Sequence, residues 1–282
     1  MNLLFSIVLL VLSIQSCADQ NSDGDAVPAG TRYYFSIFGD SRDGNAIFSG
    51  LQSRSVLAGR PLFTVHVGDM ISSPESFGQW PSFIVLTKTF FEQKNFYPVV
   101  GNHDVNDAQS LDVFQAAFPK VGGTGYYSKV LADCFCVFLN TEDLETKPGI
   151  IGPAQLNWLE LELASEPAKA AKFRIVFTHR PAFPQNHHLG HPLEPAETLH
   201  ELYKKYGIEA VVSGHEHSYS KIEKDGIIYL ITGSAGSPLF TAAGPSSAFL
   251  HYMQVSVQNE LLQFRAIDFF GKVRDDFKIN LR

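Results

Sequence analysis

Short polar clusters that directly follow apolar, strand-like runs constrain this chain more than any other feature. Five runs are each followed at once by a small residue and then by Asp, Asn or His side chains: Gly39-Asp40-Ser41-Arg42, Gly68-Asp69, Gly101-Asn102-His103-Asp104, Thr178-His179-Arg180-Pro181 and Ser213-Gly214-His215-Glu216-His217. Glycine lets the backbone turn sharply and brings the next side chain to the edge of a sheet. We therefore expect five distant segments to meet at one sheet edge.

Strand-like and helix-like segments alternate through most of the chain. Runs rich in Val, Ile, Phe and Tyr predict strands at 33–38, 62–67, 96–100, 126–130, 135–140, 173–177 and 210–212. Helical spacing predicts helices at 46–58, 77–93, 108–118, 154–164 and 196–206, and the pattern after 227 is all-β. This alternation predicts a layered α/β fold with reactive residues on loops at the carboxyl ends of strands. No linker-like break interrupts 31–282, so we expect one domain there.

The side chains in the five clusters are typical of ligands to divalent metal ions. Mixed Asp, Asn and His donors suit Zn, Mn or Fe better than Ca or Mg, which prefer all-oxygen shells. A carboxylate between two such ions can bridge them, and the pair can activate a water and hold both oxygens of an in-line displacement.

The clusters resemble, in identity and order, those of the calcineurin-like metallophosphoesterases, a family that includes the purple acid phosphatases. The resemblance spans residues 33–219, and Gly-Asn-His-Asp and Gly-His-Glu-His are its most specific motifs. It implies a four-layer α/β/β/α sandwich of two mixed sheets flanked by helices, with the metal site at the carboxyl ends of strands. The implied activity is hydrolysis of a small phosphomonoester or phosphodiester by metal-bound hydroxide.

The same resemblance implies a ligand set for two divalent ions of the Zn, Mn or Fe class. Asp69 would bridge them. The other ligands of one ion would be Asn102, His179 and His215. The other ligands of the second ion would be Asp40 and His217.

The resemblance also implies roles for His103 and Asp104. His103 would be the general acid that protonates the leaving oxygen, or a cation that steadies the phosphoryl group, with Asp104 orienting its ring. The chemistry agrees, because the pKa of histidine permits proton donation near pH 7 and a neighbouring carboxylate can fix the tautomer.

The chain departs from the family pattern at Arg42, where most members have a histidine ligand. The purple acid phosphatases use a tyrosine three residues after the second Asp, and that position is Ser72 here. One metal site is therefore short of a ligand, which Asp43 or Asn45 could replace. The guanidinium of Arg42 could grip a phosphate oxygen, the reading we favour, or form a salt bridge with Asp43.

The first sixteen residues are expected to form a signal peptide. Residues 3–12 are almost wholly apolar but too short to span a bilayer, and small residues follow them. The segment ending at Cys17 resembles a bacterial lipoprotein cleavage box, and we favour lipidation of Cys17 over ordinary secretion. Residues 17–30 are polar and predict a flexible tether. These features predict an exported lipoprotein, in the periplasm or at the outer membrane or cell surface, held to the membrane through that lipid.

The formal net charge of -7 argues against nucleic acid as a partner, because an acidic surface repels phosphate backbones. It does not exclude a small phosphorylated substrate, since a local metal charge can outweigh the global field. The sequence leaves the oligomeric state open.

Cysteine is not the expected catalyst. Cys134 and Cys136 lie two apart in one predicted strand and point to the same face, which disfavours a disulfide and predicts buried free thiols.

The histidines outside the five clusters are left out of the ligand set. His66 is expected to pack inside a strand, and His200 and His251 to lie at the surface. Three more stand in a proline-rich stretch, 181–195, that reads as a solvated loop or, less favoured, as a loop over the site: His187, His188 and His191.

Two rival interpretations remain. One is a surface-attached binding protein that has kept the fold with an impaired site, which the replacement of a ligand by Arg42 favours. The other is a one-metal enzyme that keeps only the Asn102 site.

Overall fold

The structure is a computed structural model that describes residues 27–28, 30–241, 244 and 247–281. The expected signal peptide, Cys17 and most of the tether lie outside the described residues.

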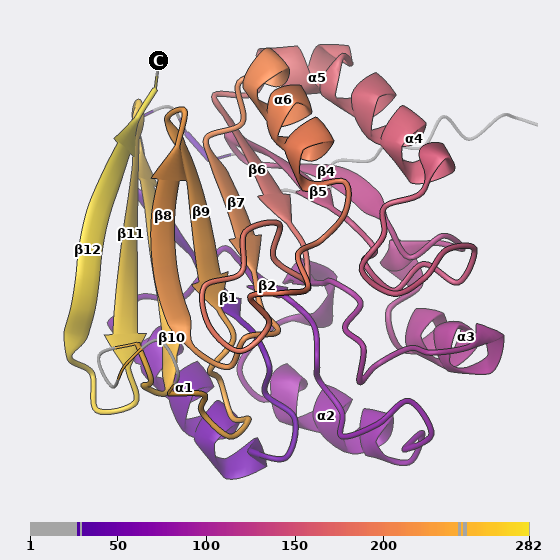
Figure 1. Ribbon diagram of the computed structural model, residues 1–282. Helices are drawn as coiled ribbons and strands as arrows, with labels where there is room; N and C mark the ends of the chain where they lie inside the picture. Colours follow the sequence, from indigo (N-terminus) through magenta and orange to yellow (C-terminus); the bar gives the residue numbers. More distant parts are fainter. Residues whose placement is uncertain (1–26, 29, 242–243, 245–246, 282) are drawn as a thin grey trace, which may run out of the picture.

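Two six-stranded sheets form the centre of the molecule (Figure 1). The first has the order β12-β11-β10-β1-β2-β3. Its strands are β1 (Tyr33–Phe38), β2 (Phe63–His66), β3 (Phe96–Pro98), β10 (His251–Gln258), β11 (Leu261–Asp268) and β12 (Val273–Asn280). The strands β1, β2 and β3 run parallel, and the other three pair antiparallel, so the sheet is mixed.

The second sheet has the order β4-β5-β6-β7-β9-β8. Its strands are β4 (Tyr127–Leu131), β5 (Cys134–Phe138), β6 (Phe173–Phe177), β7 (Ala210–Ser213), β8 (Tyr219–Lys224) and β9 (Ile227–Thr232). The four central strands are parallel, and β4 and β8 are antiparallel edge strands.

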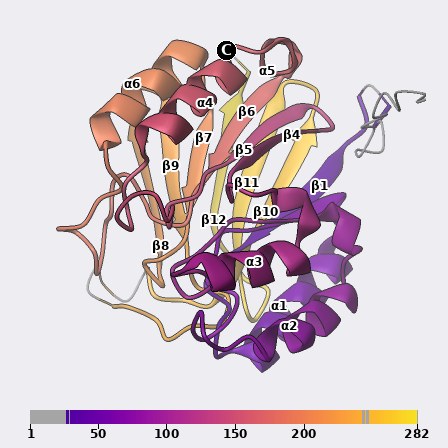
Figure 2. The ribbon, with the colours of Figure 1, turned by 90° about the vertical axis from the view of Figure 1, so that its right-hand side faces the viewer.

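Helices cover the outer face of each sheet, as Figures 1 and 2 show. On the first sheet lie α1 (Asn45–Ala58), α2 (Gln79–Lys88) and α3 (Ala108–Ala117), with short 3₁₀ turns at Gln93–Asn95 and Pro119–Val121. On the second lie α4 (Pro153–Leu163), α5 (Glu166–Ala170) and α6 (Ala196–Tyr206). The four-layer α/β/β/α sandwich is therefore confirmed. Among the described residues, no helix is long and apolar enough to cross a bilayer.

The apolar strands are buried on both faces, which explains their nearly continuous hydrophobic runs. In β5, Cys134, Cys136 and Phe138 belong to the core between the sheets. The alternate residues Phe135 and Val137 pack in the core under α4 and α6. Both cysteines are buried free thiols, as expected.

Several expected boundaries differ from the observed ones. The helix expected at 77–93 spans only Gln79–Lys88. Beyond it the backbone nitrogen of Phe90 donates to the carbonyl of Thr87, which tightens the last turn, and Phe91 is buried in the core. Helix α5 and strand β8 were not expected as separate elements.

The expectation that His200 and His251 lie at the surface is wrong. Each is 1% exposed. His200 Nδ1 lies 2.8 Å from the hydroxyl of Tyr229, and His251 Nε2 lies 3.0 Å from the hydroxyl of Thr232. Both partners are on β9, and a buried imidazole is tolerated where such hydrogen bonds satisfy it. His66 is fully buried, as expected.

Candidate metal centre

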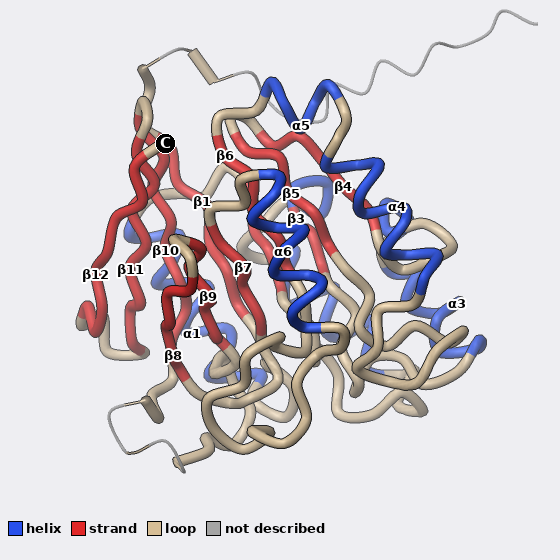
Figure 3. Tube along the Cα trace, turned by 45° about the horizontal axis from the view of Figure 1, so that its top comes forward, coloured by secondary structure: helices blue, strands red, loops and turns tan. Residues whose placement is uncertain are grey.

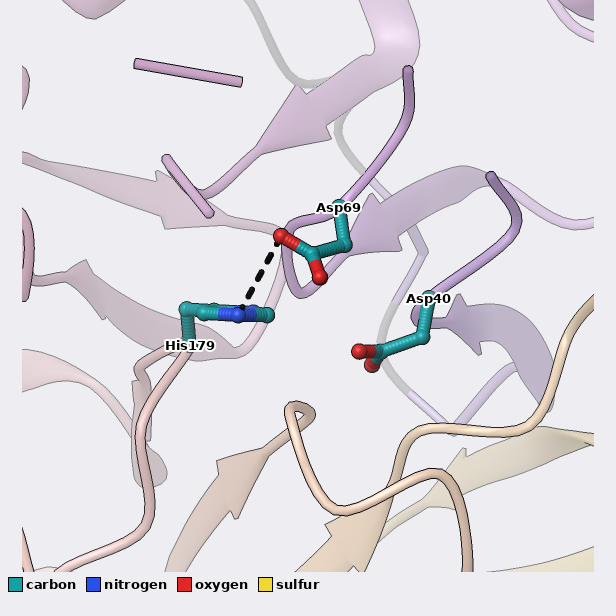
Figure 4. Close-up of side chains that lie close together, drawn as sticks. All are labelled: Asp40, Asp69 and His179. Carbon is teal, nitrogen blue, oxygen red and sulfur yellow. Dashed lines mark ion pairs between the residues drawn. The ribbon is translucent and has the colours of Figure 1, made fainter. Parts of the chain in front are cut away.

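The five polar clusters meet at one end of the two sheets, on the loops that follow β1, β2, β3, β6 and β7 (Figure 3). Figure 4 shows Asp40, Asp69 and His179 pointing toward a common centre, and one donor atom of each lies within 4.8 Å of the others. The oxygen donors Asp40, Asp69 and Asn102 come from the first sheet. The nitrogen donors His179, His215 and His217 come from the second.

Four donors converge on the Asn102 side of the centre. His179 Nε2 lies 3.0 Å from Asn102 Oδ1, 3.2 Å from His215 Nδ1 and 3.3 Å from Asp69 Oδ1. Donors about 2.0–2.2 Å from a tetrahedral Zn ion lie roughly 3.3–3.6 Å from one another. The three separations from His179 Nε2 are close to those edges, so each of the three neighbours can share a divalent ion with His179.

Fewer donors lie on the Asp40 side. His217 Nε2 is 3.4 Å from Asp40 Oδ1, and Arg42 Nε is 3.4 Å from Asp69 Oδ2. The Asp40 carboxylate also accepts hydrogen bonds from the backbone nitrogen of His215, at 2.9 and 3.1 Å. This side therefore offers two carboxylates and one imidazole, together with a guanidinium.

Two imidazoles are oriented as metal ligands usually are. His179 Nδ1 donates to the carbonyl of Val67 and His217 Nδ1 to that of Pro238, each at 2.8 Å. These bonds fix the tautomer that leaves Nε2 facing the centre. In His215 the inward atom is Nδ1, and the outer Nε2 lies 3.2 Å from Arg180 Nη1.

The backbone adopts left-handed conformations at four of the six candidate ligands. The φ angles are 53° at Asp40, 61° at Asp69, 69° at His215 and 43° at His217. Such conformations cost a non-glycine residue roughly 1–2 kcal/mol. Four of the eight non-glycine residues with positive φ in the described chain are thus candidate ligands. Concentration of this cost at one place is typical of a functional site.

A glycine before Asp69 is required by close packing. Gly68 has a φ of 92°, and a Cβ there would lie 2.5 Å from His179 Nδ1. Any larger residue would push the imidazole out of line with the other donors.

The electrostatic field of the centre favours a cation. Burial alone would lower the pKa of His179, but the carboxylates of Asp69, Asp40 and Glu142 outweigh it and raise that pKa above its usual value. Burial likewise opposes protonation of His217, whose pKa is nonetheless raised by its contact with Asp40. The field that favours a protonated imidazole also favours a metal ion.

The ring of His103 has a different partner from the one expected. Its Nδ1 lies 2.7 Å from the backbone carbonyl of Ser72, which leaves Nε2 4.0 Å from Asp69 Oδ2. Asp104 is fully buried and accepts backbone N–H bonds from Gly101, Asp69, Met70 and Ile71, at 2.8–3.3 Å. The carbonyl of Ser72 therefore orients His103, and Asp104 braces the loops after β2 and β3.

Sequence reasoning missed a charged pair beside the centre. Arg180 donates from Nε and Nη2 to the two carboxylate oxygens of Glu142, at 2.7 and 2.9 Å. Burial is the largest cause that lowers the pKa of His215, and the positive charges of His179 and Arg180 lower it further. Glu142 stands four residues beyond Phe138, the last residue of β5, so it lies in the same kind of strand-end loop as the five clusters.

The stretch 181–195 was expected to be a solvated loop, but part of it lies over the site. Glu216 accepts backbone bonds from Gln185, Asn186 and His188, at 2.7–3.1 Å. The ring of His188 stacks on His215 with centroids 4.0 Å apart, while His187 and His191 remain exposed. On the other side, Phe240 stacks on His217 at 4.5 Å.

The protein is thus a two-sheet α/β sandwich with a candidate cation site, in which Asp, Asn and His donors converge at the strand ends. The sequence profile of the calcineurin-like phosphoesterases matches residues 39–219, which contain all five clusters. The chain therefore belongs to the calcineurin-like phosphoesterase family.

The known proteins that resemble this chain include the following three. The serine/threonine-protein phosphatase CPPED1 of Danio rerio is 24% identical over 177 residues, which are 60% of this chain and 56% of the relative. The chain thus spans little more than half the length of that curated relative. Purple acid phosphatase PPD1 from yellow lupin (Lupinus luteus) seeds has a TM-score of 0.75 at 17% identity, over 89% of this chain and 54% of that one. GAP50, the anchor in the inner membrane complex of Plasmodium, has a TM-score of 0.65 at 17% identity, over 89% of each chain. The two solved structures share the fold.

Proposed function

We propose that the protein is a metal-dependent phosphoesterase that hydrolyses small phosphomonoesters or phosphodiesters. The observation that carries this proposal is the convergence of Asp69, Asn102 and His215 on His179 Nε2, within 3.3 Å. A divalent cation of the Zn, Mn or Fe class bound there would neutralise phosphoryl oxygens and make a bound water more acidic. The phosphatase names of two of the similar proteins agree with this reaction class.

The residues around the centre have distinct proposed roles. His103 presents Nε2 toward Asp69 while the Ser72 carbonyl holds its other nitrogen, so it can donate a proton to the leaving oxygen. Asp69 is central because its two oxygens face two sides of the site. Asp40 holds the backbone of His215 and the ring of His217 in place.

Metal content and activity measured together test the proposal. The purified protein is assayed for bound Zn, Mn and Fe and for hydrolysis of chromogenic phosphate monoesters and diesters. Asp69→Asn should abolish turnover and lower the metal content. Asp112→Asn, at an exposed position of α3, is the matched control and should change neither. A wild-type protein without metal and without turnover after Mn or Zn supplementation would contradict the proposal.

A non-catalytic binding protein is the second candidate. Arg42 stands in place of a ligand that most of the family has, and GAP50 is named as an anchor rather than as an enzyme. Retention of phosphate esters by the protein without their hydrolysis would favour this role.

We also propose that the protein is exported and anchored through a lipid on Cys17. The apolar segment 3–12 and the small residues before Cys17 support this location.

A further inference from the structure

Arg42 places a positive charge where the central carboxylate would meet a second ion. Asp69 Oδ1 faces His179 at 3.3 Å, while Asp69 Oδ2 faces Arg42 Nε at 3.4 Å. We propose that Arg42 replaces the second ion, so that the chain holds one divalent cation tightly, on the Asn102 side. This inference rests on the proposed function and departs from the two-ion expectation that the family resemblance implied.

The guanidinium lies between the carboxylates of Asp69 and Asp43, and the Arg42 backbone is fixed as well. Its Nη1 lies 3.0 Å from Asp43 Oδ2, and Asp43 Oδ1 accepts a short hydrogen bond from the hydroxyl of Ser72. The backbone nitrogen of Arg42 donates to the carbonyl of Asp69 at 3.1 Å. The side chain is 18% exposed, so much of it is withdrawn from water. Nε has no hydrogen-bond partner among the described residues, so its contact with Asp69 is an ion pair that leaves the N–H for another acceptor.

Of the two substitute ligands for a second ion, Asp43 is paired with other side chains and Asn45 lines a different cavity. Asp43 pairs with Arg42 and Ser72, and Ser72 also donates to Gln79 Oε1 at 3.1 Å. Asn45 lines a separate cavity of about 280 Å³ together with those same residues, Asp43, Ser72 and Gln79. Neither Asp43 nor Asn45 therefore completes the Asp40 side, where Asp40 already accepts bonds from His215.

The balance of charge favours one ion. Asp40 and Asp69 are buried and together carry two negative charges, which one divalent cation neutralises. Arg42 and Asp43 neutralise each other. A second divalent cation against Asp69 Oδ2 would leave two positive charges uncompensated beside a guanidinium, and repulsion is strong where water is largely excluded.

Manganese loading of the chelated protein tests this inference. The wild type should retain one equivalent of Mn²⁺ after gel filtration and give the electron paramagnetic resonance spectrum of an isolated ion. Arg42→His removes the charge and adds the imidazole that most of the family has. It should bind a second equivalent on the order of 100-fold more tightly than the wild type and show an exchange-coupled spectrum.

Two further variants separate the causes. Arg42→Gln removes the charge without adding a ligand, so it should raise the affinity for a second Mn²⁺ ion by less than Arg42→His does. It also provides the test of the charge if Arg42→His fails to fold. Arg54→His, on α1, repeats the same substitution away from the centre and should keep one equivalent.

The outcomes distinguish this inference from the proposed function. A wild type that retains two coupled Mn²⁺ ions, or Arg42 variants that gain no second ion, would overturn the role of Arg42 and leave the phosphoesterase proposal intact. A wild type that retains neither Mn²⁺ nor Zn²⁺ and shows no turnover with either ion would overturn both.

Discussion

The backbone nitrogen of Asp69 donates a hydrogen bond to Asp104 Oδ2 over 2.9 Å, which ties the loop of the central carboxylate to the loop that carries Asn102 and His103. Asp104 accepts three further hydrogen bonds from backbone N–H groups, so its carboxylate satisfies donors in both loops that would otherwise need water. Its neighbour His103 makes a single ring hydrogen bond to the loop after β2, from Nδ1 to the carbonyl of Ser72 at 2.7 Å, and its Nε2 faces the centre. Substitutions of these two adjacent residues should therefore affect different properties: stability for Asp104 and turnover for His103.

Asp104→Asn should unfold at a lower temperature, because an amide offers one acceptor oxygen and turns an NH₂ group toward backbone donors. We expect a loss of about 3 kcal/mol in the free energy of unfolding, with weaker metal binding. Thermal denaturation and metal titration measure both. The exposed Asp112→Asn should change neither property. If Asp104→Asn keeps the unfolding temperature and metal affinity of the wild type, the bonds to Asp104 do not stabilise the two loops.

His103→Gln should keep the stability and metal content of the wild type but lose turnover by about 10²- to 10⁴-fold, the usual contribution of a general acid. The loss should be larger for esters with poor leaving groups than for nitrophenyl esters, whose leaving oxygen needs little protonation. Equal losses for both substrates would argue for a role in binding the phosphoryl group instead.

Glu142→Gln should lower metal affinity by about 10-fold or more, because Arg180 would lose its carboxylate beside His215. The matched control is Glu209→Gln, which breaks the pair that Glu209 makes with Arg174 at 2.9 Å, away from the candidate ligands. That control should lose stability and keep its metal affinity. Isothermal titration of both variants with Zn²⁺ tests the difference, and equal affinities would refute it.

Acid should destabilise the protein partly through His251. Burial lowers the pKa of this imidazole to about 4, although the Phe249 carbonyl and the charge of Asp268 oppose the change. The unfolded chain binds the proton near pH 6.5, so stability falls as the pH drops from about 6.5 to 4, by on the order of 3 kcal/mol. In denaturant titrations across that range, His251→Gln should lose stability less steeply than the wild type. His191→Gln, at an exposed position, should lose stability with falling pH as steeply as the wild type does. If His251→Gln also loses stability as steeply as the wild type, this account is wrong.

Cys17→Ala should release the protein from the membrane fraction of a bacterial host or leave it as an unprocessed precursor. The wild type should remain with membranes until detergent is added, and mass spectrometry should find an acylated Cys17 at its N-terminus. A soluble wild type with an unmodified N-terminus would instead indicate ordinary secretion.

Local patterns in the sequence predict a layered α/β fold and the meeting point of the site, whereas the two-sheet, four-layer arrangement was implied by the family resemblance. Strand ends can be read from apolar runs, and parallel strands bring their carboxyl ends to one edge, as Asp40, Asp69 and Asn102 show. Partners across the fold could not be read in this way. Asp104 is held by backbone N–H groups up to 35 residues away, and the buried ring of His251 bonds Thr232 of the other sheet.

The division of donors between the sheets makes the centre sensitive to how the sheets pack. The contacts between the oxygen donors and the candidate histidine ligands cross from one sheet to the other, so a shift of either sheet changes these distances together. Phe138 of β5 stacks on Tyr97 of β3 across that interface, with ring centroids 5.9 Å apart. Metal affinity should therefore depend partly on how the hydrophobic core packs. A core substitution that contacts no ligand is expected to change the affinity for the metal ion.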